Sequence, residues 1–294
     1  MSQVWLVTGS ASGLGRDIVQ AALAAGHRVI ASARDPRQLA DLVERHGEQQ
    51  VRAVALDVTD AQAAQDAVTA AIDAFGRLDV VVNNAGYGHV SAFEQTDADD
   101  FRAQIDTNFY GVVNVTRAAL PVLRAQRSGH IFQISSVGGR LGTPGLSAYQ
   151  AAKWAVGGFS EVLAREVAPF GVKVCVIEPG GMRTNWGVRA RGSVARPLPD
   201  YEPSVGALLD MLTPYIGHET GDPAKVAQLV VRLAAHDAPP LHLLAGSDAV
   251  HYAGEADAAR AAEGERWRAI SVSTDFACEG ALPAFPQTDA TGPR

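Results

Sequence analysis

Short apolar runs alternate with longer, alanine-rich segments along most of this chain. The runs predict strands, because they are brief, rich in β-branched residues and continuously apolar, as in a sheet covered on both faces. We expect strands at Val4–Val7, Arg28–Ser32, Val51–Ala55, Val80–Asn83, His130–Ser135, Lys173–Glu178 and Leu241–Leu244. Alternation of strands with helical segments predicts an α/β fold with a mostly parallel seven-stranded sheet and helices on both faces.

The intervening segments carry apolar residues at helical spacing. Pro121 falls inside one of them, where its missing N–H predicts a kink or a break. A tail rich in proline and small residues ends the chain, and we expect Ala281–Arg294 to be loosely held. Helices are expected at Arg16–Ala25, Ala61–Phe75, Asn108–Gln126, Ser147–Val167 and Glu255–Ile270.

Residues 181–221 do not fit the alternation. This segment contains four prolines and one expected short helix near Ser204–Ile216. A long insertion after a late strand is more often a functional lid than a linker, and we call this segment the lid. We therefore expect a catalytic domain over residues 1–250 that carries the lid, and a C-terminal helical extension and tail over residues 251–294.

Composition narrows the class of protein. The chain has 294 residues, 47% of them hydrophobic, which is ample for a buried core, and a net charge of −7 argues against nucleic-acid or anionic-membrane partners. No apolar stretch is long enough to span a bilayer, and the start lacks the features of a secretion signal. Cys175 and Cys278 are too few for a disulfide framework, and no cluster has metal-ligand spacing. We expect a cytoplasmic protein without a metal.

A glycine-rich loop directly follows the first expected strand and opens the first helix. Its glycines are Gly9, Gly13 and Gly15. Glycines at this position let the chain turn tightly and bring backbone N–H groups against a pyrophosphate at a helix N-terminus. An ordinary strand-to-helix turn is the alternative, but the place of the loop in the alternating pattern favours dinucleotide binding.

With this loop the chain resembles the short-chain dehydrogenase/reductase family, in its single-domain branch. Further family motifs follow in order: Asp57-Val58, Asn83-Asn84-Ala85-Gly86, Asn108, Ser135-Ser136, Tyr149-x-x-x-Lys153 and Pro179-Gly180. The resemblance extends from Val4 to Gly246. It implies a doubly wound Rossmann fold and an oxidoreductase that moves hydride between a nicotinamide and a carbonyl or secondary alcohol.

Two of these motif residues, Tyr149 and Lys153, lie four positions apart and share one face of the expected helix. A tyrosine pKa of about 10 is too high for proton transfer near neutrality, and an adjacent ammonium pulls it down. The resemblance implies that Tyr149 is the general acid or base, that Ser136 donates to the substrate oxygen, and that Lys153 lowers the tyrosine pKa and holds the nicotinamide ribose. It also implies that Asn108 positions a water beside Lys153. Ser135 is the alternative to Ser136, but the spacing of thirteen residues to Tyr149 favours Ser136.

The same resemblance assigns the cofactor contacts. Met182 is assigned to the nicotinamide end, although plain core packing is an alternative for this side chain. The full set is Gly9, Ser10, Ser12, Gly13, Leu14, Gly15, Arg34, Asp57, Val58, Asn84, Ala85, Gly86, Tyr149, Lys153, Pro179, Gly180, Met182 and Thr184.

The end of the second strand indicates which dinucleotide is preferred. An acid at this position binds the ribose 2′-hydroxyl of NAD, whereas a nearby arginine suits the 2′-phosphate of NADP. Here the acid position falls on Ala33 and Arg34 follows, which favours NADP(H). Ser10 is expected to add a hydroxyl to the same phosphate. NAD(H) remains possible if Arg34 is merely a solvated cation and Asp35 serves the ribose.

The substrate end is less determined by the sequence. His89, Gly138 and Trp186 are candidate substrate contacts. Four arginines of the lid suggest an anionic substrate such as a thioester, or else a solvated loop or contacts to the cofactor's own phosphates. They are Arg183, Arg189, Arg191 and Arg196.

The leading hypothesis is therefore an NADP(H)-dependent ketoreductase for a small to medium organic molecule. A 3-oxoacyl-thioester reductase and a hydroxysteroid-type dehydrogenase are the alternatives among enzymes. A non-catalytic dinucleotide-binding regulator is the alternative from another class. Family resemblance also implies a homodimer or homotetramer built on the helices that carry Asn108 and Tyr149. We expect its apolar surface to come from Val112, Val115, Ala119, Ala155 and Phe159.

Overall fold

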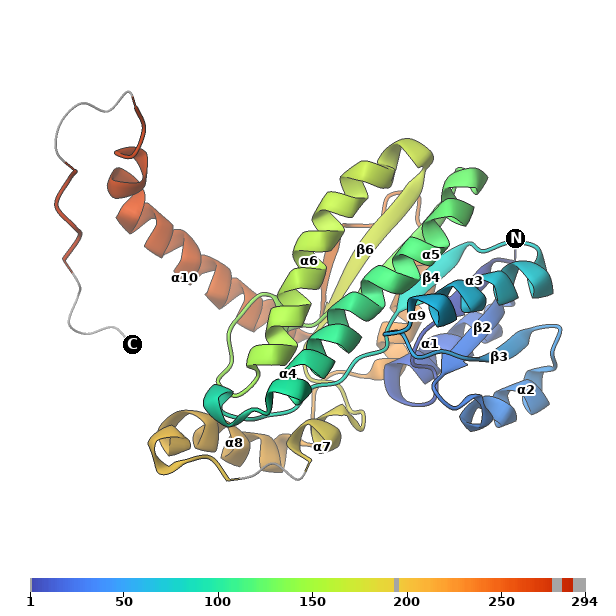
Figure 1. Cartoon of the computed structure of the whole chain (residues 1–294), viewed down its shortest axis with the longest axis horizontal. Coiled ribbons are helices and arrows are strands. Elements are labelled where there is room, and N and C mark those ends of the chain that lie inside the picture. Colours follow the sequence, from blue (N-terminus) through green and yellow to red (C-terminus); the bar gives the residue numbers. More distant parts are fainter. Residues whose placement is uncertain (1, 193–195, 277–281, 288–294) are drawn as a thin grey trace.

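The computed structural model describes residues 2–192, 196–276 and 282–287 (Figure 1). Within them seven parallel strands form one sheet in the order β3-β2-β1-β4-β5-β6-β7. The strands are β1 Val4–Val7, β2 Arg28–Ala33, β3 Val51–Ala55, β4 Val80–Asn83, β5 Gly129–Ile134, β6 Val172–Pro179 and β7 His242–Ala245. The expected doubly wound α/β fold is confirmed, and each expected strand lies within a residue or two of its observed bounds.

Helices cover both faces of this sheet. The helices are α1 Gly13–Ala24, α2 Ala40–His46, α3 Ala61–Phe75, α4 Ala98–Ile105, α5 Gly111–Gln126, α6 Ser147–Val167, α7 Trp186–Arg191, α8 Ala207–Tyr215, α9 Pro223–Ala234 and α10 Ser247–Val272. On β1, Trp5 and Val7 point into the core beneath α1, α2 and α9, while Val4 and Leu6 point into the core beneath α3, α5 and α6. Burial on both faces explains why the strand is continuously apolar.

The helix that contains Pro121 differs from its expected form. α5 runs unbroken through Pro121, and the irregularity lies upstream, in a π-helical turn at Asp106–Tyr110. Proline at this position removes the bond to the carbonyl of Arg117, and both residues lie on the exposed face, where water can hydrogen-bond to that carbonyl. The predicted break at Pro121 is therefore wrong.

The C-terminal helix is longer than expected. α10 starts at Ser247, directly after a left-handed Gly246, so the expected boundary at residue 250 falls inside this helix. Only Ala249 and Ala253 of α10 are buried, and Figure 1 shows the helix projecting from the body. Residues 282–287 have no regular secondary structure. The rest of the expected loose tail, and Cys278, lie outside the described residues.

Two further expectations concern side chains on the helices and strands. Val112, Val115 and Ala119 are buried within the chain itself, so they do not supply the apolar surface predicted for an oligomer. Cys175 is buried in β6, and burial raises its thiol pKa to about 12. It packs there as a small apolar side chain.

Candidate functional site

A cavity of about 1300 Å³ lies at the carboxyl ends of the strands, beneath the lid. It reaches both the loop after β1 and the loop after β4. Strands β1 and β4 are neighbours in the sheet, but the chain first runs outward from β1 through β2 to β3 before it returns to β4. Such a reversal of strand order is where open α/β sheets bind ligands. Most of the expected site residues line this cavity; Ser10, Gly15 and Asn108 do not.

The glycine loop has the conformation that a phosphate cradle needs. Gly9 and Gly13 adopt left-handed backbone, with φ of +67° and +57°. A Cβ on Gly9 would lie 2.9 Å from the Cα of Ala85, and one on Gly15 would collide with the carbonyl oxygen of Gly9. The hydroxyl of Ser12 at the N-cap of α1 makes no capping bond, which leaves the first N–H groups of the helix free for an anion. These residues fit a dinucleotide pyrophosphate.

Asn84 holds the loop after β4 against the glycine loop. Its side-chain nitrogen donates to the carbonyl of Thr8 at 2.9 Å, and its backbone N–H donates to the Thr8 hydroxyl at 2.9 Å. Ser10, by contrast, turns away from the cavity: its fully buried hydroxyl donates to the carbonyl of Val7 at 2.8 Å. The expected contact of this hydroxyl with a phosphate does not agree with that geometry.

Two charged residues, Arg34 and Asp35, directly follow β2, and in the described part of the chain only the aspartate has an ion-pair partner. Asp35 accepts two hydrogen bonds from the guanidinium of Arg37, at 2.8 and 2.9 Å, and these bonds lower the pKa of its carboxyl. Arg34 lines the cavity, and among the described residues no carboxylate pairs with it. Farther along, Asp57 accepts from the hydroxyl of Thr59 at 2.7 Å, which is the main reason that its pKa is lowered.

Ser136 and Tyr149 come together at the catalytic end of the cavity. Ser136 follows β5, and its hydroxyl oxygen accepts the N–H of Gly138 at 3.0 Å, which leaves the hydroxyl proton free to donate. Burial raises the pKa of Tyr149 to about 12, and a hydrogen bond with Ser136 partly opposes this rise. Ser135 donates instead to the backbone carbonyl of Lys153 at 3.3 Å, so the geometry favours Ser136.

Lys153 occupies the next turn of α6. Its ammonium donates to the carbonyl of Ile134 at 2.9 Å and lies 5.6 Å from the centre of the Tyr149 ring. Burial lowers the pKa of Lys153 to about 8. The sequence predicts a tyrosine pKa lowered by the lysine; in this protein burial instead raises the pKa of Tyr149 and lowers that of Lys153.

Asn108 lies in the π-helical turn, fully buried. Its side-chain nitrogen donates to the carbonyls of Tyr87 and Gln104, at 2.7 and 2.8 Å. Its oxygen has no hydrogen-bond partner among the described residues. This oxygen and the ammonium of Lys153 both lie beside Gly86: a Cβ on that glycine would collide with the oxygen and would lie 3.5 Å from the ammonium. An unpaired acceptor near the lysine is suited to hold a water there.

The three candidate substrate residues all line the cavity. The indole of Trp186 stands against the Tyr149 ring, with centroids 5.1 Å apart, and His89 is paired with Asp100 at 2.8 Å. Apolar side chains dominate this end of the cavity. They are Val90, Val137, Leu141, Leu146, Leu208, Met211, Leu212, Tyr215 and Ile216.

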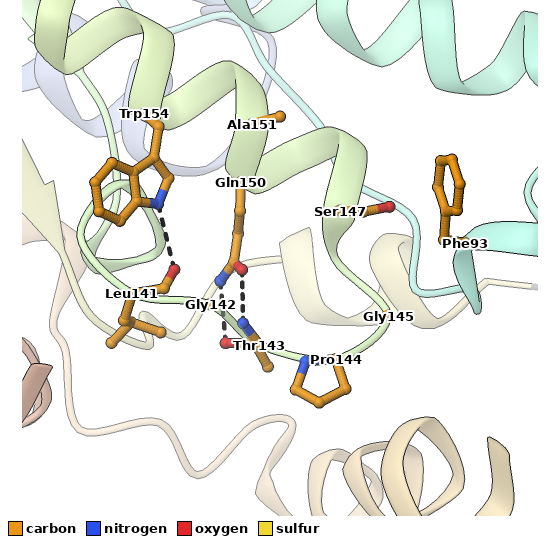
Figure 2. Close-up of a pocket in the computed structure, with 10 residues that line it drawn as sticks. All are labelled: Phe93, Leu141, Gly142, Thr143, Pro144, Gly145, Ser147, Gln150, Ala151 and Trp154. Carbon is orange, nitrogen blue, oxygen red and sulfur yellow. Dashed lines mark hydrogen bonds between the residues drawn. The ribbon is translucent and has the colours of Figure 1, made fainter. Parts of the chain in front are cut away.

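One wall of this end is the loop 141–146, which Gln150 fixes in place. Figure 2 shows the Gln150 amide bonded twice to Thr143, at 2.7 Å to its N–H and 3.0 Å to its hydroxyl, while the Trp154 indole reaches the carbonyl of Leu141. A second hollow of about 520 Å³ lies on the outer side of the loop. Gln150, which the sequence did not single out, thus shapes the substrate end.

The lid arginines do not act as a cluster. Arg196 pairs with Glu202 at 2.7 Å, and Arg183 donates to the backbone of Glu219 at 2.8 Å. Of the four, only Arg189 lines the cavity. The lid arginines therefore do not support the hypothesis that the substrate is an anion.

Asp248 is a second residue that the sequence did not indicate. It lies in the first turn of α10, and its carboxylate accepts the N–H of Gly181 at 2.7 Å. A Cβ on Gly180 would collide with the same carboxylate. The C-terminal helix therefore fixes the loop after β6 at the expected nicotinamide end.

Two kinds of site are not found in the part of the chain that the structure describes. No three histidine, cysteine, aspartate or glutamate side chains gather there as metal ligands could. No helix in that part has both the length and the apolar character to cross a bilayer.

Comparisons with known proteins agree with this geometry. The family model described as short chain dehydrogenase matches residues 3–192. The chain is 51% identical over 276 residues to Oxidoreductase BOA17 of Botryotinia fuckeliana, covering 93% of this chain and 100% of that protein. It is 41% identical over 184 residues to the 3-ketodihydrosphingosine reductase of Bacteroides thetaiotaomicron, covering 63% of this chain and 65% of that protein.

A solved structure is similar over nearly the whole length. A short-chain dehydrogenase from Streptomyces avermitilis is 40% identical, with a TM-score of 0.84, and the match covers 94% of this chain and 99% of that one. The match therefore covers more of the chain than the family model, which ends at residue 192.

Proposed function

The chain belongs to the short-chain dehydrogenase family and is an oxidoreductase, and from that premise we propose that it is an NADP(H)-dependent ketoreductase. It would transfer hydride between the nicotinamide and a carbonyl or secondary alcohol. The observation that carries this proposal is that Ser136, Tyr149 and Lys153 line the same cavity as the glycine loop.

NADPH supplies a hydride to the carbonyl carbon when it is bound. The hydroxyl of Ser136 donates a hydrogen bond to the carbonyl oxygen and stabilises the negative charge that develops there. Tyr149 holds its proton at neutral pH, because its pKa of about 12 lies far above that pH, and it transfers this proton to the same oxygen as a strongly basic alkoxide develops there. Lys153 and the unpaired oxygen of Asn108 then provide the route by which a proton returns from water to the tyrosine.

Preference for NADP(H) rests on the residues after β2. Arg34 is free to pair with a 2′-phosphate, whereas Asp35 is held by Arg37 and the acid position is Ala33. Fluorescence titration with NADPH and NADH tests this. Arg34→Ala should weaken NADPH binding by about 10- to 100-fold and leave NADH within about twofold, since an arginine–phosphate bond is lost only with NADPH. Arg45→Ala, an exposed cation on α2, is the matched control. Tighter binding of NADH by the unaltered protein would overturn the preference.

Apolar side chains at the catalytic end favour a ketone with bulky apolar substituents, and the hydroxysteroid-type alternative fits this better than an anionic thioester does. The similarity to a protein named 3-ketodihydrosphingosine reductase points in the same direction. A non-catalytic regulator is less well supported, because all four residues of the expected catalytic set are present.

We further propose a cytoplasmic homodimer or homotetramer. Three large apolar side chains are exposed on or beside α5 and α6: Tyr110 in the turn before α5, and Trp154 and Val162 on α6. α5 and α6 cover the same face of the sheet (Figure 1). Apolar side chains exposed on adjacent helices are typical of a subunit interface. Elution at monomer mass in gel filtration would contradict this assembly.

A further inference from the structure

One arginine of the lid reaches the glycine loop. Arg189 lies on α7, and its guanidinium Nη2 donates to the hydroxyl of Ser12 at 3.1 Å, while its Nε donates to the carbonyl of Asn185 at 3.3 Å. Both Arg189 and Ser12 line the cavity. Because Ser12 is the N-cap of α1, the arginine cation stands beside the positive end of that helix.

Arg189 is exposed, and its cation and the N-terminus of α1 both attract an anion to the same place. Within the described residues no carboxylate pairs with Arg189, which bonds only the neutral oxygens of Ser12 and Asn185 there, whereas Arg196 pairs with Glu202. The first N–H groups of α1 are also left free, because the Ser12 hydroxyl bonds Arg189 rather than capping the helix. Arginine and helix therefore favour the same anion.

We propose that Arg189 binds the pyrophosphate of the dinucleotide from the lid side, opposite the glycine loop. This inference rests on the proposed dinucleotide function. The guanidinium has five N–H donors in a fixed fork, so it can bind a phosphate oxygen while α7 stays in place. The assignment is to the pyrophosphate rather than the 2′-phosphate, because Ser12 belongs to the glycine loop and the 2′-phosphate is assigned to Arg34 after β2.

This contact links the cofactor to the substrate end. α7 begins at Trp186, whose indole packs on the Tyr149 ring. Thr184, just before this helix, lies against the glycine loop: its Cβ is 3.6 Å from where a Cβ on Gly13 would be. A pyrophosphate bound by Arg189 would thus add a second attachment of α7 to the glycine loop, beside the contact of Thr184 with Gly13. We infer that NADPH stabilises the position of Trp186 over the catalytic tyrosine and so lowers the KM of the ketone.

Binding of NADPH and of NADH to Arg189→Ala tests the assignment. Both dinucleotides contain the pyrophosphate, so both dissociation constants should rise by a similar factor, about 5- to 30-fold. Arg34→Ala should weaken NADPH alone. Arg191→Ala is the matched control, because Arg191 is an equally exposed arginine of α7 that does not line the cavity, and this variant should bind both dinucleotides as the unaltered protein does. Thermal unfolding without ligand checks that each variant is folded.

The outcomes separate this assignment from the proposed function. If the unaltered protein binds dinucleotides and Arg189→Ala binds both within twofold, the assignment is wrong while the proposed function stands. A loss confined to NADPH would place Arg189 at the 2′-phosphate and also overturn the assignment. If the unaltered protein binds neither dinucleotide, the proposed function fails and the assignment fails with it. Parallel losses, with a raised KM for the ketone at saturating NADPH, support both steps.

Discussion

The ammonium of Lys153 lies 5.6 Å from the centre of the Tyr149 ring, and both side chains are buried. Burial disfavours the charged form of each group, so it lowers the pKa of the lysine to about 8 and raises that of the tyrosine to about 12. The protein alone therefore keeps the proton on the tyrosine and holds the lysine proton weakly. That is the protonation state that carbonyl reduction requires of Tyr149.

Lys153→Met should change how stability depends on pH. Between pH 8 and 10.5 the unfolded chain keeps the lysine proton while the folded protein has lost it, so Lys153 makes the protein more stable as pH rises through this window. The unfolding free energy of the unaltered protein minus that of the variant should increase by about 3 kcal/mol from pH 8 to pH 10.5. Urea denaturation at pH 8 and pH 10.5 measures this change.

Lys225→Met is the control for that experiment, because Lys225 is exposed on α9. Its difference from the unaltered protein should stay constant across the window. Parallel pH curves for Lys153→Met and the unaltered protein would contradict the buried position of this ammonium.

Asn108→Leu should destabilise the protein by about 2–4 kcal/mol, because the buried carbonyls of Tyr87 and Gln104 both lose their donor. The turnover number should fall as well, since the unpaired oxygen beside Lys153 is removed. Thermal unfolding followed by circular dichroism measures the first effect and NADPH consumption the second. Asn185→Leu, at an exposed position, is the control. A variant as stable as the unaltered protein would show that these two bonds do not stabilise it.

Asp248→Ala should loosen the loop after β6, because the N–H of Gly181 loses its acceptor. We expect a loss of about 1–2 kcal/mol in unfolding free energy and a several-fold weaker binding of NADPH. Asp248→Asn keeps an acceptor oxygen at the same place and should behave nearly as the unaltered protein does. Glu265→Ala, exposed farther along α10, controls for general effects of the helix. Equal weakening by the alanine and asparagine variants would contradict this account.

The sequence predicted the sheet and most of the cavity because those signals are local. A buried parallel strand is continuously apolar, and the glycine loop and the Tyr149–Lys153 pair each lie within one turn or one helix. The interactions it did not predict join residues far apart in the chain: Asp248 contacts Gly181 across 67 residues, and Arg189 contacts Ser12 across 177. No spacing rule indicates such pairs.

Other predictions were wrong because they depended on the burial or the hydrogen-bond partner of a single residue. The Ser10 hydroxyl bonds the carbonyl of Val7 rather than facing the cavity. Pro121 stays within α5 because the carbonyl it leaves unpaired is on the exposed face. The predicted lowering of the Tyr149 pKa is wrong because burial, which a sequence does not display, raises this pKa.

Transfer of deuteride from 4,4-dideuterated NADPH to an apolar ketone tests the central claim most directly. Mass spectrometry should find deuterium on the carbinol carbon of the product formed by the unaltered protein. Tyr149→Phe should bind NADPH normally but transfer deuteride at least about a thousandfold more slowly, and Tyr110→Phe, an exposed tyrosine, should match the unaltered protein. Tight NADPH binding without deuterium transfer to any ketone of a broad apolar panel, or undiminished transfer by Tyr149→Phe, would contradict the account.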